Sequence, residues 1–147
     1  MSRKSSREFA MKLLYQMEIQ KEDREEQFKV AIEDSETSLS QKDNGYISDV
    51  VSGVFANLED IDEIIELNSK GWKLHRISRI DLSILRLCIY EIKFRDDIPL
   101  SVSINEAVEL AKKYSAEDSG AFINGILSNV IPPADKTVNV KGGSADE

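Results

Sequence analysis

Cations that stand beside aromatic rings are the side chains best placed to do chemistry in this sequence. They form two groups, one near each end of the chain: Arg3, Lys4, Arg7 and Tyr15, and Lys112, Lys113, Tyr114 and Phe122. Cations neutralise phosphates and aromatic rings stack on unpaired bases, so the combination is typical of single-stranded RNA binding. The first three cations also occupy the start of a predicted helix, where the helix dipole disfavours positive charge. A role other than helix stability is therefore indicated for them.

Catalytic signals are poor. His75 is the only histidine, so histidine-based triads, zinc motifs and di-metal carboxylate sites lack the partners they need. Cys88 is the only cysteine and lies in the most apolar segment, where packing is expected rather than nucleophilic work. With no internal disulfide to form, a reducing cytoplasm is the expected location. We expect no enzyme, no cofactor and no metal site.

Composition limits the remaining classes. The chain has 147 residues, which fits one domain, and its net charge of −8 argues against adhesion to nucleic acid over the whole surface. Local positive charge remains, because residues 70–79 contain four cations and no acid: Lys70, Lys73, Arg76 and Arg79. No apolar run approaches the roughly 20 residues that span a bilayer, and the N-terminus lacks the uninterrupted apolar core of a secretory signal.

Helical periodicity runs through the chain and no strand-like alternation is sustained, which predicts an all-α bundle of about seven helices. Residues 80–94 are apolar on every side, so this helix is expected at the centre, with Ser78 and Asp81 at its start. Residues 1–131 would form the domain. Residues 132–147, rich in Pro, Gly, Asp and Lys, are expected to be disordered.

Three further serine–acid spacings predict helix starts of the capping-box type, in which the serine oxygen accepts from an orphan amide. The pairs are Ser5 with Glu8, Ser103 with Glu106, and Ser115 with Asp118. Asp118 has two interpretations. It either caps the last helix or, as a free acid beside Lys112 and Lys113, repels phosphate.

Three stretches resemble the NusB family of bacterial transcription antitermination factors: REFAMKLLYQ near the start, IDLSILRLCIYEI in the centre, and SINEAVELAKKYSAEDSGAFINGIL near the end. The similarity runs in order from about Arg3 to Ile131. It implies an all-helical fold of two small subdomains without catalysis. It also implies binding of the boxA element, a single-stranded RNA segment, together with NusE, a small-subunit ribosomal protein, in a complex on RNA polymerase. The resemblance also allows a homodimer that masks the RNA surface.

The resemblance further implies roles for individual residues. The family's basic N-terminus falls on Arg3, Lys4 and Arg7, although Ser5 and Ser6 interrupt the run, which predicts weaker RNA affinity. The other residues implied in RNA binding are Tyr15, Lys112, Lys113, Asp118 and Phe122. Arg76 and Asp81 correspond to positions that face the protein partner.

Two alternatives stay open. The broken basic run and the acidic charge also fit a helical protein–protein adaptor that has lost RNA binding. The module further resembles the N-terminal domain of some ribosomal-RNA cytosine methyltransferases, although the predicted tail leaves no room for a methyltransferase domain.

Overall fold

The structure is a computed structural model that describes residues 2–20, 24–35, 41–134 and 136. These residues form seven α-helices and one short 3-10 helix, with no strand among them, so the all-α prediction is confirmed. The helices are α1 (Arg3–Gln20), α2 (Arg24–Ser35), α3 (Gln41–Ala56), α4 (Leu58–Leu67), α5 (Arg79–Phe94), α6 (Leu100–Tyr114) and α7 (Ser119–Leu127), with the 3-10 helix η2 at Leu74–Arg76. No helix of this part of the chain is long and apolar enough to cross a membrane.

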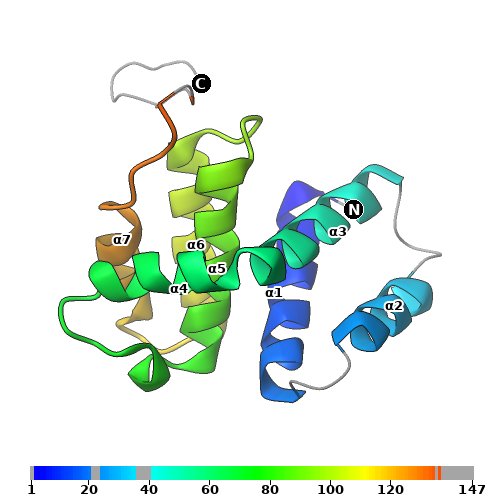
Figure 1. The fold of residues 1–147 in the computed structure, drawn as a ribbon, viewed down its shortest axis with the longest axis horizontal. Helices are drawn as coiled ribbons and strands as arrows, with labels where there is room; N and C mark the ends of the chain where they lie inside the picture. Colours follow the sequence, from blue (N-terminus) through cyan, green and yellow to red (C-terminus); the bar gives the residue numbers. More distant parts are fainter. Residues whose placement is uncertain (1, 21–23, 36–40, 135, 137–147) are drawn as a thin grey trace.

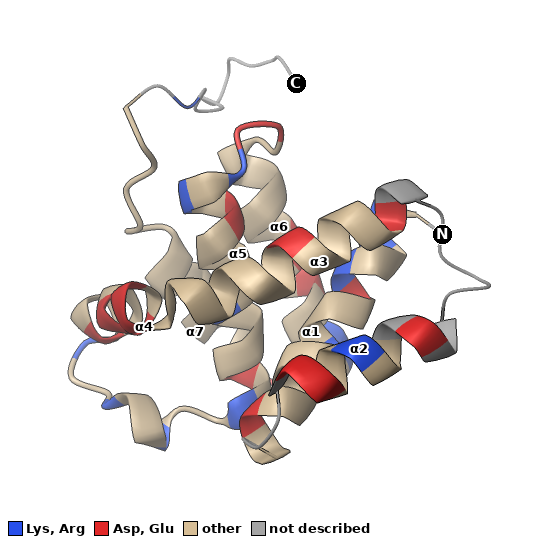
Figure 2. Ribbon diagram, turned by 45° about the vertical axis from the view of Figure 1, so that its right-hand side comes forward, with Lys and Arg blue, Asp and Glu red and all other residues tan. Residues whose placement is uncertain are grey.

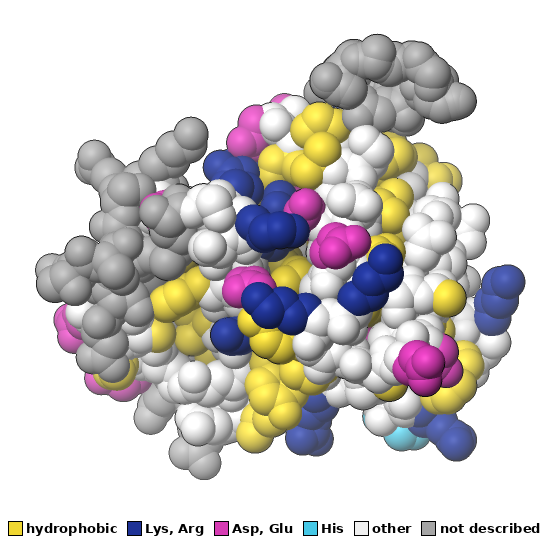
Figure 3. All heavy atoms as spheres, turned by 180° about the vertical axis from the view of Figure 1, so that it is seen from behind, with side chains coloured by type: hydrophobic (Ala, Val, Ile, Leu, Met, Phe, Trp, Pro, Cys, Tyr) yellow, Lys and Arg dark blue, Asp and Glu magenta, His cyan; other side chains and the backbone are white. Residues whose placement is uncertain are grey.

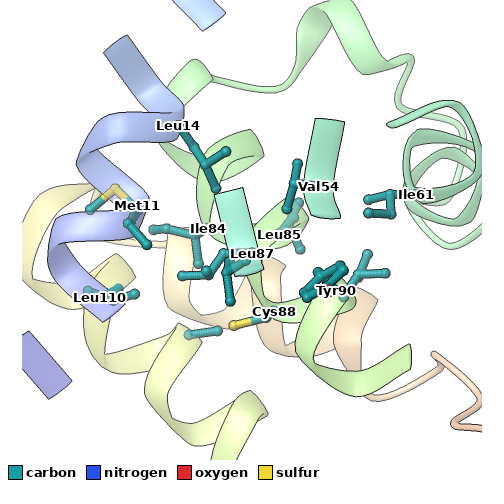
Figure 4. Close-up of a cluster of buried hydrophobic side chains, with 14 of the residues drawn as sticks. Met11, Leu14, Val54, Ile61, Ile84, Leu85, Leu87, Cys88, Tyr90 and Leu110 are labelled. Carbon is teal, nitrogen blue, oxygen red and sulfur yellow. The ribbon is translucent and has the colours of Figure 1, made fainter. Parts of the chain in front are cut away.

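Helix α5 is the centre of the fold, as its apolar sequence predicts. Its N-terminus is capped by Ser78, whose hydroxyl oxygen accepts a hydrogen bond from the backbone N–H of Asp81 at 3.2 Å. The helix packs against α1, α3, α4, α6 and α7, and every residue from Asp81 to Ile92 is buried. Figure 4 shows its side chains meeting those of α1, α3 and α6 in one apolar cluster.

The helices form two groups. In Figure 1, α1, α2 and α3 lie on one side of the molecule and α4, α6 and α7 lie with α5 on the other, and α5 packs against helices of both groups. The close crossing of α3 and α5 depends on Gly53, because a Cβ atom there would lie 2.2 Å from the ring of Tyr90. This arrangement matches the expected pair of small helical subdomains.

The predicted starts of α1 and α6 are wrong, and α7 begins at Ser119 rather than directly after the predicted cap Ser115. Helix α1 begins at Arg3, and the hydroxyl of Ser2, rather than that of Ser5, accepts the capping bond at 3.1 Å from the Ser5 N–H. Helix α6 begins at Leu100, directly after Pro99, which occupies the N-cap position. The ring of proline fixes its φ angle, and no side chain caps this helix. The hydroxyl of Ser103 instead turns inward and donates to Glu91 at 2.7 Å. Tertiary partners have overridden the local spacing at both sites.

Glu91 is the centre of a buried polar cluster that joins four helices. Its carboxylate accepts bonds from the Arg7 guanidinium at 2.8 and 3.2 Å, from the hydroxyl of Ser103, and from the hydroxyl of Tyr46. Burial disfavours the charge of Arg7, but the hydrogen bond and the charge of Glu91 outweigh it, so the pKa of Arg7 is raised. Burial also raises the pKa of Tyr46, and the Glu91 carboxylate raises it further. The cluster fixes α1 and α3 against α5 and α6.

The packed body extends past the predicted boundary at residue 131. Lys136 is buried, and its ammonium group donates to the carbonyl oxygens of Glu91 and Ile92, both at 2.9 Å. A cation at the C-terminal end of α5 also complements the dipole of that helix. Pro132 and Pro133 are half-buried and Lys136 is buried, whereas Ala134 is exposed, and the rest of the predicted tail lies outside the described residues.

Replacing Arg7 by alanine should severely destabilise the fold, because it leaves the Glu91 carboxylate buried without its cation. Breaking a buried ion pair in this way costs about 3–5 kcal/mol. That is a large share of a typical free energy of unfolding of about 5–15 kcal/mol. Urea unfolding followed by circular dichroism measures the loss. Lys4→Ala is the matched control, since Lys4 is an exposed cation on the same helix. Equal unfolding midpoints for the two variants would contradict the structural role of Arg7.

Candidate nucleic-acid interface

Cations from opposite ends of the chain meet in a groove between the start of α1 and the end of α6. The Lys4 Nζ lies 3.1 Å from Glu106 Oε1, and the Lys113 Nζ lies 2.6 Å from Glu8 Oε2. The groove has a volume of about 280 Å³ and is lined by Lys4, Arg7, Glu8, Glu106, Glu109, Leu110, Lys112 and Lys113. The structure therefore brings Lys4 together with Lys112 and Lys113, from which it is almost 110 residues away in the sequence.

We define these three cations and their acidic neighbours Glu8, Glu106 and Glu109 as the α1–α6 groove. Figure 3 shows the face that contains it, with basic and acidic side chains interleaved. Each ammonium group has a carboxylate partner, the loosest being Lys112 Nζ with Glu109 Oε2 at 3.7 Å. The hydrogen bond from Lys113 lowers the pKa of Glu8, although partial burial opposes the shift. A phosphate that enters the groove must therefore compete with these carboxylates.

Aromatic rings continue the surface beyond the groove. The Tyr114 ring lies 5.1 Å from the ammonium nitrogen of Lys12 and 5.4 Å from that of Lys113, within the range of cation–π contact. Tyr15 is half-buried on α1, three residues beyond Lys12. Tyr114 thus contacts a cation of α1 and a cation of α6.

Two predicted RNA contacts are engaged by other side chains of the protein. Arg3 stacks on the ring of Tyr46, 4.4 Å from its centroid, on the α3 side of α1. Arg7 is 3% exposed and bound to Glu91, so the prediction of an exposed phosphate contact is corrected for this residue. Ser6 is also buried and donates to Asp43 at 3.0 Å. A cation at position 6 would have no free surface, so the interrupted basic run removes less exposed charge than the sequence suggests.

The joint between α6 and α7 holds the second aromatic group. Asp118 occupies the N-cap position of α7, but its side chain makes no capping hydrogen bond, so the predicted cap function is wrong. Phe122 packs edge-on against Trp72, with ring centroids 6.0 Å apart and an interplanar angle of 64°. Sequence reasoning missed Trp72. Its position could have indicated a role, because Trp72 is the only tryptophan of the chain and lies inside the acid-free basic segment 70–79.

The two residues predicted to face a protein partner have different environments. Arg76 is exposed in η2, whereas Asp81 is 6% exposed. The Asp81 carboxylate accepts hydrogen bonds from the hydroxyls of Ser115 at 2.6 Å and Ser119 at 3.0 Å. Asp81 therefore ties α5 to the α6–α7 joint and does not present its charge to a partner.

Other reactive side chains contribute no site. Cys88 is fully buried and its thiol donates to the carbonyl oxygen of Ser103, which confirms the predicted packing role. Burial raises the pKa of that thiol and makes it a poor nucleophile. Within the described ranges, no three His, Cys, Asp or Glu side chains gather closely enough to hold a metal ion.

Comparisons with known proteins agree with this fold. Residues 4–132 match the model of the NusB family. The transcription antitermination protein NusB of Acetivibrio thermocellus is 62% identical over 131 residues, covering 89% of each chain, and that of Clostridium novyi is 53% identical, covering 89% of this chain and 98% of the relative. Among solved structures, T. maritima NusB superposes with a TM-score of 0.80 at 36% identity, covering 87% of this chain and 89% of that one.

A second solved structure contains NusB and NusE, described as antitermination factors, in complex with double-stranded RNA. Its matching chain has a TM-score of 0.75 at 30% identity, covering 86% of this chain and 92% of that one. Sequence and architecture thus agree over nearly the whole folded body, and the chain belongs to the NusB family.

Proposed function

We propose that this protein is a transcription antitermination factor that binds boxA RNA together with NusE and supports transcription of ribosomal RNA. The α1–α6 groove is the phosphate-binding part of this site. Lys4, Lys112 and Lys113 bind the RNA backbone, and Tyr15 and Phe122 line the path of the bases. Arg3 contributes from the edge of α1, while Arg7 supports the groove from below through Glu91.

The convergence of Lys4 with Lys112 and Lys113 is the observation that carries this proposal. Although the protein has a net charge of −8, three ammonium groups from distant parts of the sequence meet in one groove, each beside a carboxylate that an RNA phosphate can replace. Family membership supports the same function, because matching relatives are named transcription antitermination proteins and one matching structure contains NusE and RNA. Because each groove ammonium already has a carboxylate partner, we expect modest affinity for RNA alone and a gain when NusE is added.

NusE is the proposed protein partner, and the pair acts within an antitermination complex on RNA polymerase. Arg76 is the exposed member of the predicted partner-facing pair, and Asp81 acts by holding the α6–α7 joint in place. Self-association is the competing state, and a solution mass measured with and without NusE and boxA RNA distinguishes the monomer from a homodimer.

A second candidate function is that of a protein–protein adaptor without RNA binding. The paired charges of the α1–α6 groove favour it, since no groove ammonium is free of a carboxylate partner. A gel shift with boxA RNA, with and without NusE, separates the two functions. The adaptor binds NusE normally and shifts no RNA in either lane.

Changing Lys4, Lys112 and Lys113 together to glutamine should weaken boxA binding while the fold persists. Glutamine keeps most of the side-chain length but removes the charge that releases counterions from the RNA. We expect roughly tenfold weaker binding near 0.1 M salt. The slope of log affinity against log salt should fall by about 2, at about 0.7 per lost contact with a single strand. Fluorescence anisotropy with end-labelled RNA measures both quantities.

Lys29→Gln is the control for this experiment, because Lys29 is an exposed cation on α2, outside the groove. It should leave both the affinity and the salt slope unchanged. An unchanged salt slope in the triple variant, with normal circular dichroism, would exclude the α1–α6 groove as the phosphate site.

Glu8→Gln should strengthen RNA binding severalfold. This change removes the carboxylate that holds the Lys113 ammonium at 2.6 Å and also removes a negative charge that repels phosphate. The same anisotropy titration measures the effect. Glu33→Gln on α2 is the matched control for net charge, since Glu33 is exposed and outside the groove. An equal gain in both variants would mean that overall charge, rather than the local pair, sets the affinity.

Arg76→Glu should weaken the complex with NusE at least tenfold, because the substitution reverses a charge at the proposed interface. The fold should persist, because Arg76 is exposed. Isothermal titration calorimetry with purified NusE measures the dissociation constant. Lys29→Glu serves as the charge-matched control. If both variants bind NusE like the wild type, Arg76 lies outside the partner interface.

A further inference from the structure

Four cations without a carboxylate partner among the described residues follow one another between the end of α4 and the first residue of α5. Figure 2 shows Lys and Arg positions spaced along this segment. Among the described residues, no carboxylate lies within 4 Å of the charged nitrogens of Lys70, Lys73, Arg76 or Arg79, in contrast to the ammonium groups of the α1–α6 groove. An anion can therefore bind these four side chains without first displacing an acidic partner.

The same segment presents a large aromatic ring to solvent. Trp72 is 51% exposed, although tryptophan side chains are highly buried on average. Its position is fixed by a tight turn in which Lys70 and Gly71 have positive φ angles of 53° and 92°. The hydroxyl of Ser69 donates to the carbonyl oxygen of Trp72 at 2.7 Å, and the Trp72 N–H donates back to the Ser69 carbonyl oxygen at 3.2 Å. These bonds hold the backbone from which the ring projects.

Trp72 and Phe122 form a ridge between two open hollows. The smaller, of about 200 Å³, is also lined by Lys70 and Gly125. A Cβ atom added at Gly125 would have no other atom within 4 Å, so the hollow is open at this position. The larger, of about 500 Å³, is also lined by Tyr114. Tyr114 in turn contacts Lys113 of the α1–α6 groove. The rings therefore continue from the groove to the basic segment.

We propose that Trp72 and Phe122 form a second part of the RNA site, a platform on which unpaired bases stack while Lys70 and Lys73 bind the adjoining phosphates. This inference rests on the proposed function and extends the RNA path beyond the α1–α6 groove. Stacking rings flanked by unpaired cations suit a single strand, because every base has a face to stack and every nucleotide carries a phosphate. A protein partner that docks on the same ridge is the rival that the experiment must exclude.

Intrinsic fluorescence tests the platform directly, because Trp72 is the only tryptophan of the chain. Full-length protein is titrated with end-labelled boxA RNA to follow binding, and with unlabelled RNA to follow tryptophan emission. Stacking should quench the emission in proportion to the bound fraction. The titrations are repeated with NusE present. The emission of the same mixture made with Trp72→Phe is then subtracted, which removes the fluorescence of any tryptophan in NusE.

Affinity provides the second measurement. Trp72→Ala should weaken RNA binding by about 5- to 100-fold, the range expected for the loss of one stacked base. Trp72→Phe keeps a ring and should restore most of the affinity. Lys70→Gln with Lys73→Gln should lower the salt slope by about 1.4, at about 0.7 per phosphate contact. Leu67→Ala is the control, because Leu67 is an exposed apolar residue that lines neither hollow.

The outcomes separate the platform from the proposed function. Quenching by RNA, together with weaker binding by Trp72→Ala but not by Leu67→Ala, supports the platform. RNA binding without quenching, and with wild-type affinity in Trp72→Ala, overturns the platform and leaves the α1–α6 groove as the RNA site. Quenching by NusE alone, with a loss of NusE affinity and not of RNA affinity in Trp72→Ala, assigns the ridge to the protein partner. No RNA binding by the wild type, with or without NusE, overturns both.

Discussion

The buried pair of Arg7 and Glu91 is the interaction on which the rest of this structure depends. Glu91 lies on the central helix, and its carboxylate bonds reach α1 through Arg7, α3 through Tyr46 and α6 through Ser103. Its backbone carbonyl also accepts from Lys136. A buried carboxylate needs all of these donors to offset its desolvation, so the four helices can adopt only a narrow range of relative positions. That constraint places Lys4 beside Glu106 and thereby forms the α1–α6 groove.

Positive charge is distributed in two ways on this acidic protein, and the difference bears on how RNA would bind. In the α1–α6 groove every ammonium has a carboxylate partner, which keeps the helices together but lowers the gain from each phosphate contact. The segment between α4 and α5 carries cations without such partners among the described residues and an exposed ring at Trp72. A strand that bound both regions would gain affinity from the second while the first set its position. Dependence on a partner such as NusE follows naturally when the groove alone binds weakly.

The sequence predicted those features that depend on one element at a time. The apolar circumference of residues 80–94 identified the central helix, and Ser78 marked its start, because burial on all sides and an N-cap leave local signals. Arg7 was assigned wrongly because its burial depends on Glu91, 84 residues away. Ser103 was assigned wrongly for the same reason, since its hydroxyl bonds to that carboxylate instead of capping a helix. The meeting of Lys4 with Lys113 followed from the family resemblance, and spacing alone would not have predicted it.

The joint between α6 and α7 shows why a loss of binding does not identify a contact. Asp81 is buried and holds Ser115 and Ser119, the residues that end α6 and begin α7. Tyr114 lies just before this tie and Phe122 just after it, so the two rings take their relative positions from Asp81. A substitution at Asp81 would shift both rings and the hollow between them, and so disturb RNA and partner surfaces together. A loss of binding at these positions must therefore be checked with a readout local to the ligand, because the buried acids Asp81 and Glu91 hold the helices that carry Tyr114, Phe122 and the cations of the α1–α6 groove.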